Sequence, residues 1–142
     1  MLIGGFAAIA HGSSLQTRDV DVCIRFGERN LRRIQMAFEG LHPVHRARPD
    51  LPLDLTPELC ARLKNLYLKT DIGIVDCLGE LIGVGGYEEA LRHSFPFEFP
   101  FGTCRLLDLD TLIKSKEAMG RPHDLLTVEH LKAVKSQLRG GQ

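Results

Sequence analysis

Two aspartates one residue apart, Asp19 and Asp21, lie in a stretch that can fold in few ways. In residues 19–24, acidic or small side chains alternate with aliphatic ones (DVDVCI), and this period of two predicts a β-strand with one buried face. Residues i and i+2 of a strand point to the same side. Both carboxylates therefore leave one face together, close enough to repel each other unless a cation lies between them.

This pair of acids has two interpretations. Carboxylate oxygens suit Mg²⁺ or Mn²⁺, and Mg²⁺ is usually held by one or two carboxylates together with substrate phosphates. Alternatively, the acids form the solvated face of an edge strand, which is the commoner origin of an isolated Asp-x-Asp. Gly4 and Gly5 favour the metal site, because glycines let backbone N–H groups approach a phosphate and a helix N-terminus attracts anions.

The composition indicates one globular domain, over residues 1–139, followed by a disordered tail at 140–142. The formal net charge is zero, so no bulk electrostatic attraction to nucleic acid or to a membrane surface is expected. No apolar run approaches the ~20 residues that cross a bilayer. The four cysteines are widely spaced, which indicates reduced core thiols and a cytoplasmic location.

Apolar periodicity and turn residues predict a mixed α/β chain. Strands are expected at 1–3, 19–25, 65–69, 72–77 and 103–107. Helices are expected at 6–11, 28–39, 87–92, 109–119 and 122–138. Residues 42–57 hold four of the seven prolines and are expected to form a long surface loop.

At two places the chain resembles a known family. Residues 3–5 (IGG) and 19–22 (DVDV) are similar to the signature of the polymerase-beta-like nucleotidyltransferase superfamily. Ala7, His11-Gly12 and Thr17 also match its small bacterial members, which include abortive-infection toxins and antibiotic-modifying enzymes. The resemblance implies an α/β (α+β) fold with a small mixed sheet of about four to six strands, helices packed on one side, and helices at the carboxyl end.

The resemblance also implies a catalytic, metal-binding triad. Asp19 and Asp21 supply two of its acids, and a third is expected on a later strand. Asp76, in the stretch IVDC, is the candidate for that third acid. Asp71 is the competitor, although its setting is more typical of a turn.

A nucleotide-binding set follows from the same resemblance. Lys116 and the later Arg121 and Asp124 match residues that line the nucleotide side of the family's cleft. The alternative for these three is a solvated helix face with Asp124 as a cap. The full nucleotide-binding set comprises Gly4, Gly5, Ser13, Thr17, Lys116, Arg121 and Asp124.

The implied activity is Mg²⁺-dependent transfer of NMP from an NTP, such as ATP, to a hydroxyl acceptor, with release of pyrophosphate. The acceptor stays open among a small molecule, tRNA and a protein, and a toxin role would add an antitoxin as partner. A non-catalytic nucleotide-binding or interaction module is the alternative, because Leu15 and Thr127 depart from the family pattern. A local basic rim for an RNA acceptor could be formed by Arg32, Arg33, Arg46, Arg48, Arg62 and Lys64.

Overall fold

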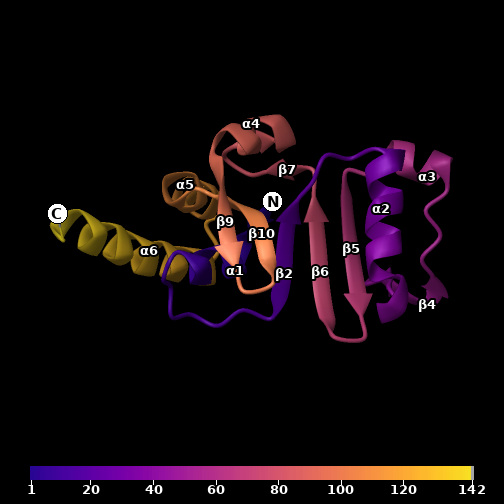
Figure 1. The fold of residues 1–142 in the computed structure, drawn as a ribbon, viewed down its shortest axis with the longest axis horizontal. Helices are drawn as coiled ribbons and strands as arrows, with labels where there is room; N and C mark the ends of the chain where they lie inside the picture. The colour runs from indigo at the N-terminus through magenta and orange to yellow at the C-terminus, as the bar shows by residue number, and fades with distance from the viewer. Residues whose placement is uncertain (142) are drawn as a thin grey trace.

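The structure is a computed structural model that describes residues 1–141, and it has a mixed α/β architecture built on one large sheet (Figure 1). The strands of this sheet are β1 (Leu2–Ile3), β2 (Asp19–Cys23), β3 (Val44–His45), β4 (Arg48–Pro52), β5 (Asn65–Thr70), β6 (Gly73–Leu78), β9 (Ser94–Phe99) and β10 (Gly102–Leu107). Two short strands pair separately, β7 (Glu80–Leu81) and β8 (Gly85–Gly86). The helices are α1 (Gly4–Ala10), α2 (Glu28–Phe38), α3 (Pro57–Arg62), α4 (Tyr87–Arg92), α5 (Leu109–Met119) and α6 (Pro122–Gly140), with a 3₁₀ turn η1 (Glu39–Leu41).

The strand order of the large sheet is β4-β3-β5-β6-β2-β1-β10-β9. Two pairs are parallel, β2 with β6 and β1 with β10, and the others are antiparallel. The sheet is therefore mixed, and β2 lies near its middle, between β6 and β1. The predicted strands at 65–69 and 72–77 correspond to β5 and β6.

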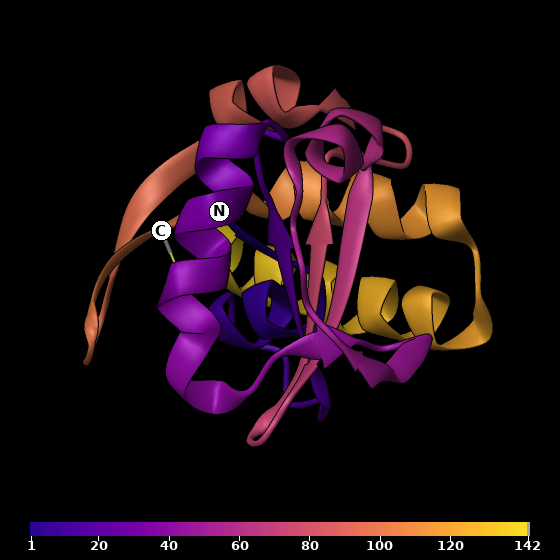
Figure 2. The same ribbon diagram turned by 90° about the vertical axis from the view of Figure 1, so that its right-hand side faces the viewer.

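Each face of the sheet packs against its own hydrophobic cluster. Leu68 on β5 and Val22 on β2 belong to the cluster that includes residues of α2 and α3. Ile3 on β1 and Cys23 on β2 belong to the cluster that includes residues of α1, α5 and α6. Successive side chains of β2 thus contribute to the two clusters in turn, as its period of two predicts. Figure 2 shows α2 on one side of the strands and the α5–α6 pair on the other.

Four features of the expected fold are wrong. The described residues form an eight-stranded sheet instead of four to six strands, and helices cover both of its faces instead of one. The expected loop at 42–57 contains β3 and β4, and β9 was not expected at all. Both β4 and β9 are edge strands that contain proline, and an edge strand tolerates a residue without an N–H donor.

The carboxyl-terminal helix is longer than expected. It extends through Gly140, where the predicted tail would begin, while Gln142 lies outside the described residues. Within residues 1–141, no helix combines the length and the apolar character needed to cross a membrane.

The alternation along β5 gives a direct test of the fold. Leu68 is fully buried, whereas the next residue, Lys69, is exposed. We expect Leu68→Ala to lower the free energy of unfolding by about 2–5 kcal/mol, because it removes buried apolar atoms and leaves a cavity. Lys69→Ala should change it by less than about 0.5 kcal/mol. Equilibrium urea unfolding measures both, and equal losses would contradict this orientation of β5.

Candidate functional site

A cleft of about 750 Å³ opens on the α1–α5 side of the sheet. It brings together the amino-terminal turn, the strands β2, β5 and β6, and the helices α5 and α6. Nine of the ten predicted site residues line the cleft: Gly4, Gly5, Ser13, Thr17, Asp19, Asp21, Asp76, Lys116 and Arg121. The tenth, Asp124, does not line it. The structure therefore gathers residues that lie more than 100 positions apart in the sequence.

Two carboxylates lie side by side at the centre of this cleft. Strands β2 and β6 are parallel, and their register pairs Asp21 with Asp76. Neighbouring strands lie about 4.8 Å apart, and paired residues point to the same face. Asp21 and Asp76 therefore project together into the cleft, and Asp19 leaves the same face of β2 two residues earlier. The competitor Asp71 lies instead in the β5–β6 turn, where its carboxylate contacts His42 Nδ1 at 2.6 Å.

The burial and crowding of Asp21 and Asp76 raise their pKa values. Burial raises the pKa of Asp21 to about 6, helped by the negative charges of Asp76 and Asp19 and opposed by Lys116 and Arg121. Burial also raises the pKa of Asp76, and the charge and hydrogen bond of Arg46 oppose that rise. A site that holds acids in this state favours any cation that can neutralise them.

One oxygen of Asp76 has no hydrogen bond. The Asp76 side chain is 14% exposed, and Arg46 Nη1 donates a hydrogen bond to its Oδ2 at 3.2 Å. The same nitrogen lies 3.0 Å from Oδ1, which is an ion-pair distance, but the contact does not have the geometry of a hydrogen bond, so the buried Oδ1 accepts none. A buried carboxylate oxygen with no hydrogen bond is destabilising, and direct coordination to a divalent cation would satisfy it better than the Arg46 ion pair does.

The glycine pair lets the acids approach the amino-terminal turn. Gly4 has φ +63°, and a Cβ at this position would overlap the Asp21 carboxylate. A Cβ on Gly5 would lie 2.5 Å from Thr17 Oγ1, which is too close for any real contact. The two glycines are therefore required by the close packing of Asp21 and Thr17 against α1. The predicted role of the two glycines, contact with phosphate, is not tested by this packing.

Lys116, Arg121 and Asp124 form one ionic cluster between α5 and α6. Lys116 Nζ contacts Asp124 Oδ1 at 3.2 Å, and Arg121 Nε contacts Oδ2 at 2.6 Å. Burial alone would raise the pKa of Asp124, but the hydrogen bonds from Arg121 and Lys116 outweigh it and hold the pKa below its usual value. Asp124 is fully buried and Lys116 nearly so, so neither lies on a solvated helix face. Asp124 thus positions two cations whose charges reach Asp21.

The remaining predicted residues shape the loop that leads into β2. Ser13 is buried, and its Oγ accepts a hydrogen bond from the Leu15 N–H at 3.3 Å. Thr17 Oγ1 donates to the Asp19 carbonyl at 3.4 Å. Both contacts fix the backbone just before the acids.

Two residues that contact the acids or their neighbours, Arg46 and Tyr67, are absent from the predicted site. Arg46 was included only in a possible basic rim, yet it reaches Asp76 from the end of β3. Tyr67 pairs in register with Asp76, and its ring lies 5.1 Å from the Arg46 guanidinium carbon. The exposed position of Tyr67 in the alternating β5 was a usable signal, whereas nothing local in the sequence marks Arg46.

The acids do not form a complete metal cage. Among residues 1–141, no group of three or more His, Cys, Asp or Glu side chains is arranged to hold a metal ion. Two adjacent carboxylates with one unsatisfied oxygen nevertheless fit Mg²⁺, which keeps several waters and takes further ligands from substrate phosphates. We therefore assign Asp21 and Asp76 as the two candidate ligands, with Asp19 as a nearby charge.

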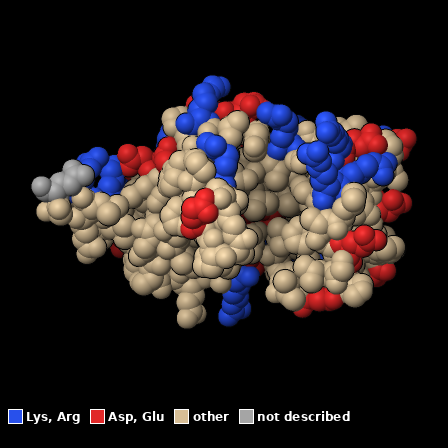
Figure 3. Space-filling view, in the orientation of Figure 1, with Lys and Arg blue, Asp and Glu red and all other residues tan. Residues whose placement is uncertain are grey.

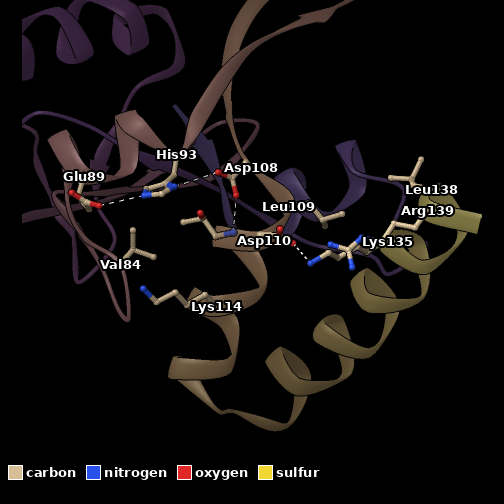
Figure 4. Close-up of a pocket in the computed structure, with 11 residues that line it drawn as sticks. Val84, Glu89, His93, Asp108, Leu109, Asp110, Lys114, Lys135, Leu138 and Arg139 are labelled. Carbon is tan, nitrogen blue, oxygen red and sulfur yellow. Dashed lines mark hydrogen bonds and ion pairs between the residues drawn. The ribbon is translucent and has the colours of Figure 1, made fainter. Parts of the chain in front are cut away.

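A second pocket, of about 620 Å³, lies beside α4, α5 and the end of α6 (Figure 4). Its acids already have partners. His93 lies between Glu89 and Asp108, with nitrogen–oxygen distances of 3.3 and 3.6 Å, and Asp110 pairs with Lys135. This pocket therefore lacks the unsatisfied oxygen and the crowded carboxylates that mark the first cleft.

Comparison with known proteins adds no family assignment to this geometry. No protein-family model matches the chain, and no curated protein matches it. Any functional assignment therefore depends on the site's own residues.

The ionic cluster predicts a large loss of stability when its acid is removed. We expect Asp124→Asn to lower the free energy of unfolding by about 3 kcal/mol or more, because it leaves the Lys116 charge buried without its partner. The matched control is Asp110→Asn, whose side chain is 65% exposed and pairs with Lys135. That change should cost less than about 1 kcal/mol. Equilibrium chemical unfolding measures both, and a similar loss in the free energy of unfolding for the two variants would contradict the assigned role of Asp124.

The raised pKa of Asp21 predicts a specific pH dependence in metal-free buffer. Between its ordinary value of 3.8 and about 6, the folded chain keeps this proton while the unfolded chain loses it. The stabilising effect of that proton is complete below pH 3.8 and is lost as the pH rises through 6. Asp21→Asn should therefore be more stable than the wild type above this range, by about 1–3 kcal/mol, and not near pH 4. Thermal unfolding from pH 4 to 8 measures the difference in stability between the variant and the wild type. A difference that does not change with pH would contradict the raised pKa of Asp21.

Proposed function

We propose that this protein is a divalent-metal-dependent nucleotidyltransferase, which moves NMP from an NTP to a hydroxyl acceptor and releases pyrophosphate. The observation that supports this best is the register of β2 and β6. It places two acids side by side, one with an oxygen that accepts no hydrogen bond, in a cleft that is also lined by four basic side chains, Arg18, Arg46, Lys116 and Arg121. The family resemblance at residues 3–5 and 19–22 supports the same class of reaction.

Asp21 and Asp76 would hold the divalent ion, and Asp19 would add negative charge beside it. When bound, Mg²⁺ or Mn²⁺ supplies stabilisation of the charge that develops on phosphate oxygens during an in-line displacement. Asp76 would also accept the proton of the acceptor hydroxyl, as a general base, on the carboxylate oxygen that does not hold the ion.

Lys116 and Arg121 would neutralise the phosphates of the NTP. Both side chains line the cleft and contact the buried Asp124. The Arg121 side chain is 58% exposed, so it can turn further toward a ligand, whereas Lys116 is fixed. Arg121 stays charged at any physiological pH and can contact two phosphate oxygens at once.

The surface favours a compact acceptor over a long RNA. The volume of about 750 Å³ is within the range of small-molecule sites. On the face shown in Figure 3, basic side chains are interspersed with acidic ones over the α2–α3 side. Arg32 pairs with Glu28, and Arg48 pairs with Asp50, so part of the possible basic rim is already neutralised. A small molecule or a protein hydroxyl is therefore the preferred acceptor class.

Transfer of label from α-³²P-labelled NTPs tests the proposed activity. Each of the four NTPs is incubated with Mg²⁺ or Mn²⁺ and with small-molecule, protein or tRNA acceptors. We expect label to reach one acceptor class, and Asp21→Asn and Asp76→Asn to reduce the rate at least about a hundredfold, because they remove charge from the reaction centre. Asp71→Asn, in the β5–β6 turn, is the matched control and should keep the rate.

Two other outcomes would reject the enzyme. Binding of Mg²⁺–ATP without any transfer would favour the alternative, a non-catalytic nucleotide-binding module. If the protein shows no binding of Mg²⁺–ATP and no transfer of label, both functions are excluded for this cleft.

A further inference from the structure

Arg46 reaches the acids of the cleft along a row of paired residues. The register across three strands pairs Tyr67 with Asp76 and Asp76 with Asp21. Arg46 follows β3, the next strand outward, and its N–H donates to the Tyr67 carbonyl at 2.9 Å. Its guanidinium carbon lies 5.1 Å from the Tyr67 ring centre, and Nη1 reaches the Asp76 carboxylate. The Arg46 side chain thus crosses one whole strand to contact the acid.

The contact between Arg46 and Asp76 is incomplete. The usual strong arrangement of arginine and carboxylate uses two nitrogens on two oxygens. Here Nη1 lies close to both oxygens but donates a hydrogen bond only to Oδ2. Asp124, by contrast, accepts hydrogen bonds from Arg121 on both oxygens and from Lys116 on Oδ1. The Arg46 side chain is also 39% exposed, so it can move away without leaving a buried cavity.

We propose that Arg46 is the resident counter-ion of Asp76, and that its guanidinium must leave this carboxylate when a divalent cation binds. This inference rests on the proposed function, since it assumes that Asp21 and Asp76 hold the cation. Arg46 would then oppose cation binding in two ways, as a competitor for the Asp76 oxygens and as a nearby positive charge. The Tyr67 ring, over which the guanidinium already lies, would keep the displaced charge at the edge of the cleft.

Binding of Mn²⁺ alone tests this, by calorimetry and by the electron paramagnetic resonance signal of free Mn²⁺. The wild type is compared at pH 7 with Arg46→Met, which keeps an unbranched side chain without the charge, and with Arg46→Gln as a second neutral variant. Arg48→Met is the matched control, because Arg48 pairs with Asp50 on β4. We expect both Arg46 variants to bind Mn²⁺ about tenfold more tightly, the effect of about 1.4 kcal/mol from one neighbouring charge. The control should match the wild type.

Asp21→Asn separates the inference from the proposed function. If the wild type binds Mn²⁺ and Asp21→Asn does not, while the Arg46 variants bind with unchanged or weaker affinity, the inference fails and the cation site stands. An equal gain in Arg48→Met would also overturn it, because the effect would then be general electrostatics. If the wild type and both Arg46 variants do not bind Mn²⁺, the proposed function fails and the inference fails with it.

Discussion

The parallel pairing of β2 with β6 is the constraint on which the site depends, because it places the Asp21 carboxylate beside that of Asp76. Two partly buried acids this close repel each other. Burial raises the pKa of both, and the negative charges of Asp76 and Asp19 add to the rise at Asp21, as that of Asp19 does at Asp76. Positive charge reaches them from three separate elements, with Arg46 after β3, Lys116 on α5 and Arg121 before α6. The fold thus brings distant cations to one repulsive pair without fully neutralising it.

The amino-terminal turn is equally constrained by the acids. A side chain on Gly4 would overlap Asp21, and one on Gly5 would overlap Thr17, so α1 can lie against β2 only with glycine at both positions. The same helix carries buried alanines into the cluster shared with α5 and α6. The same short helix therefore contributes both to the packing of the core and to the wall of the cleft.

The sequence predicts local patterns well and long-range contacts poorly. The alternation around Asp19 and Asp21 is sufficient to identify β2. Asp76 was expected only from the family resemblance, and it lines the same cleft. The strands β4 and β9 contain prolines, and whether such a segment is a strand depends on its place at a sheet edge. The contact of Arg46 with Asp76 spans 30 positions and crosses β5, and no local pattern encodes it. Asp124 shows the same limit, since its burial depends on how α5 packs against α6.

Anomalous diffraction from crystals grown with Mn²⁺ and a non-hydrolysable NTP analogue tests the central claim most directly. The account predicts a manganese peak between Asp21 and Asp76, with oxygen distances of about 2.1 Å as for Mg²⁺, and with the analogue's phosphates completing the coordination. Lys116 and Arg121 should face those phosphates. A peak elsewhere, or phosphates bound in the cleft with no metal between the two acids, would contradict it.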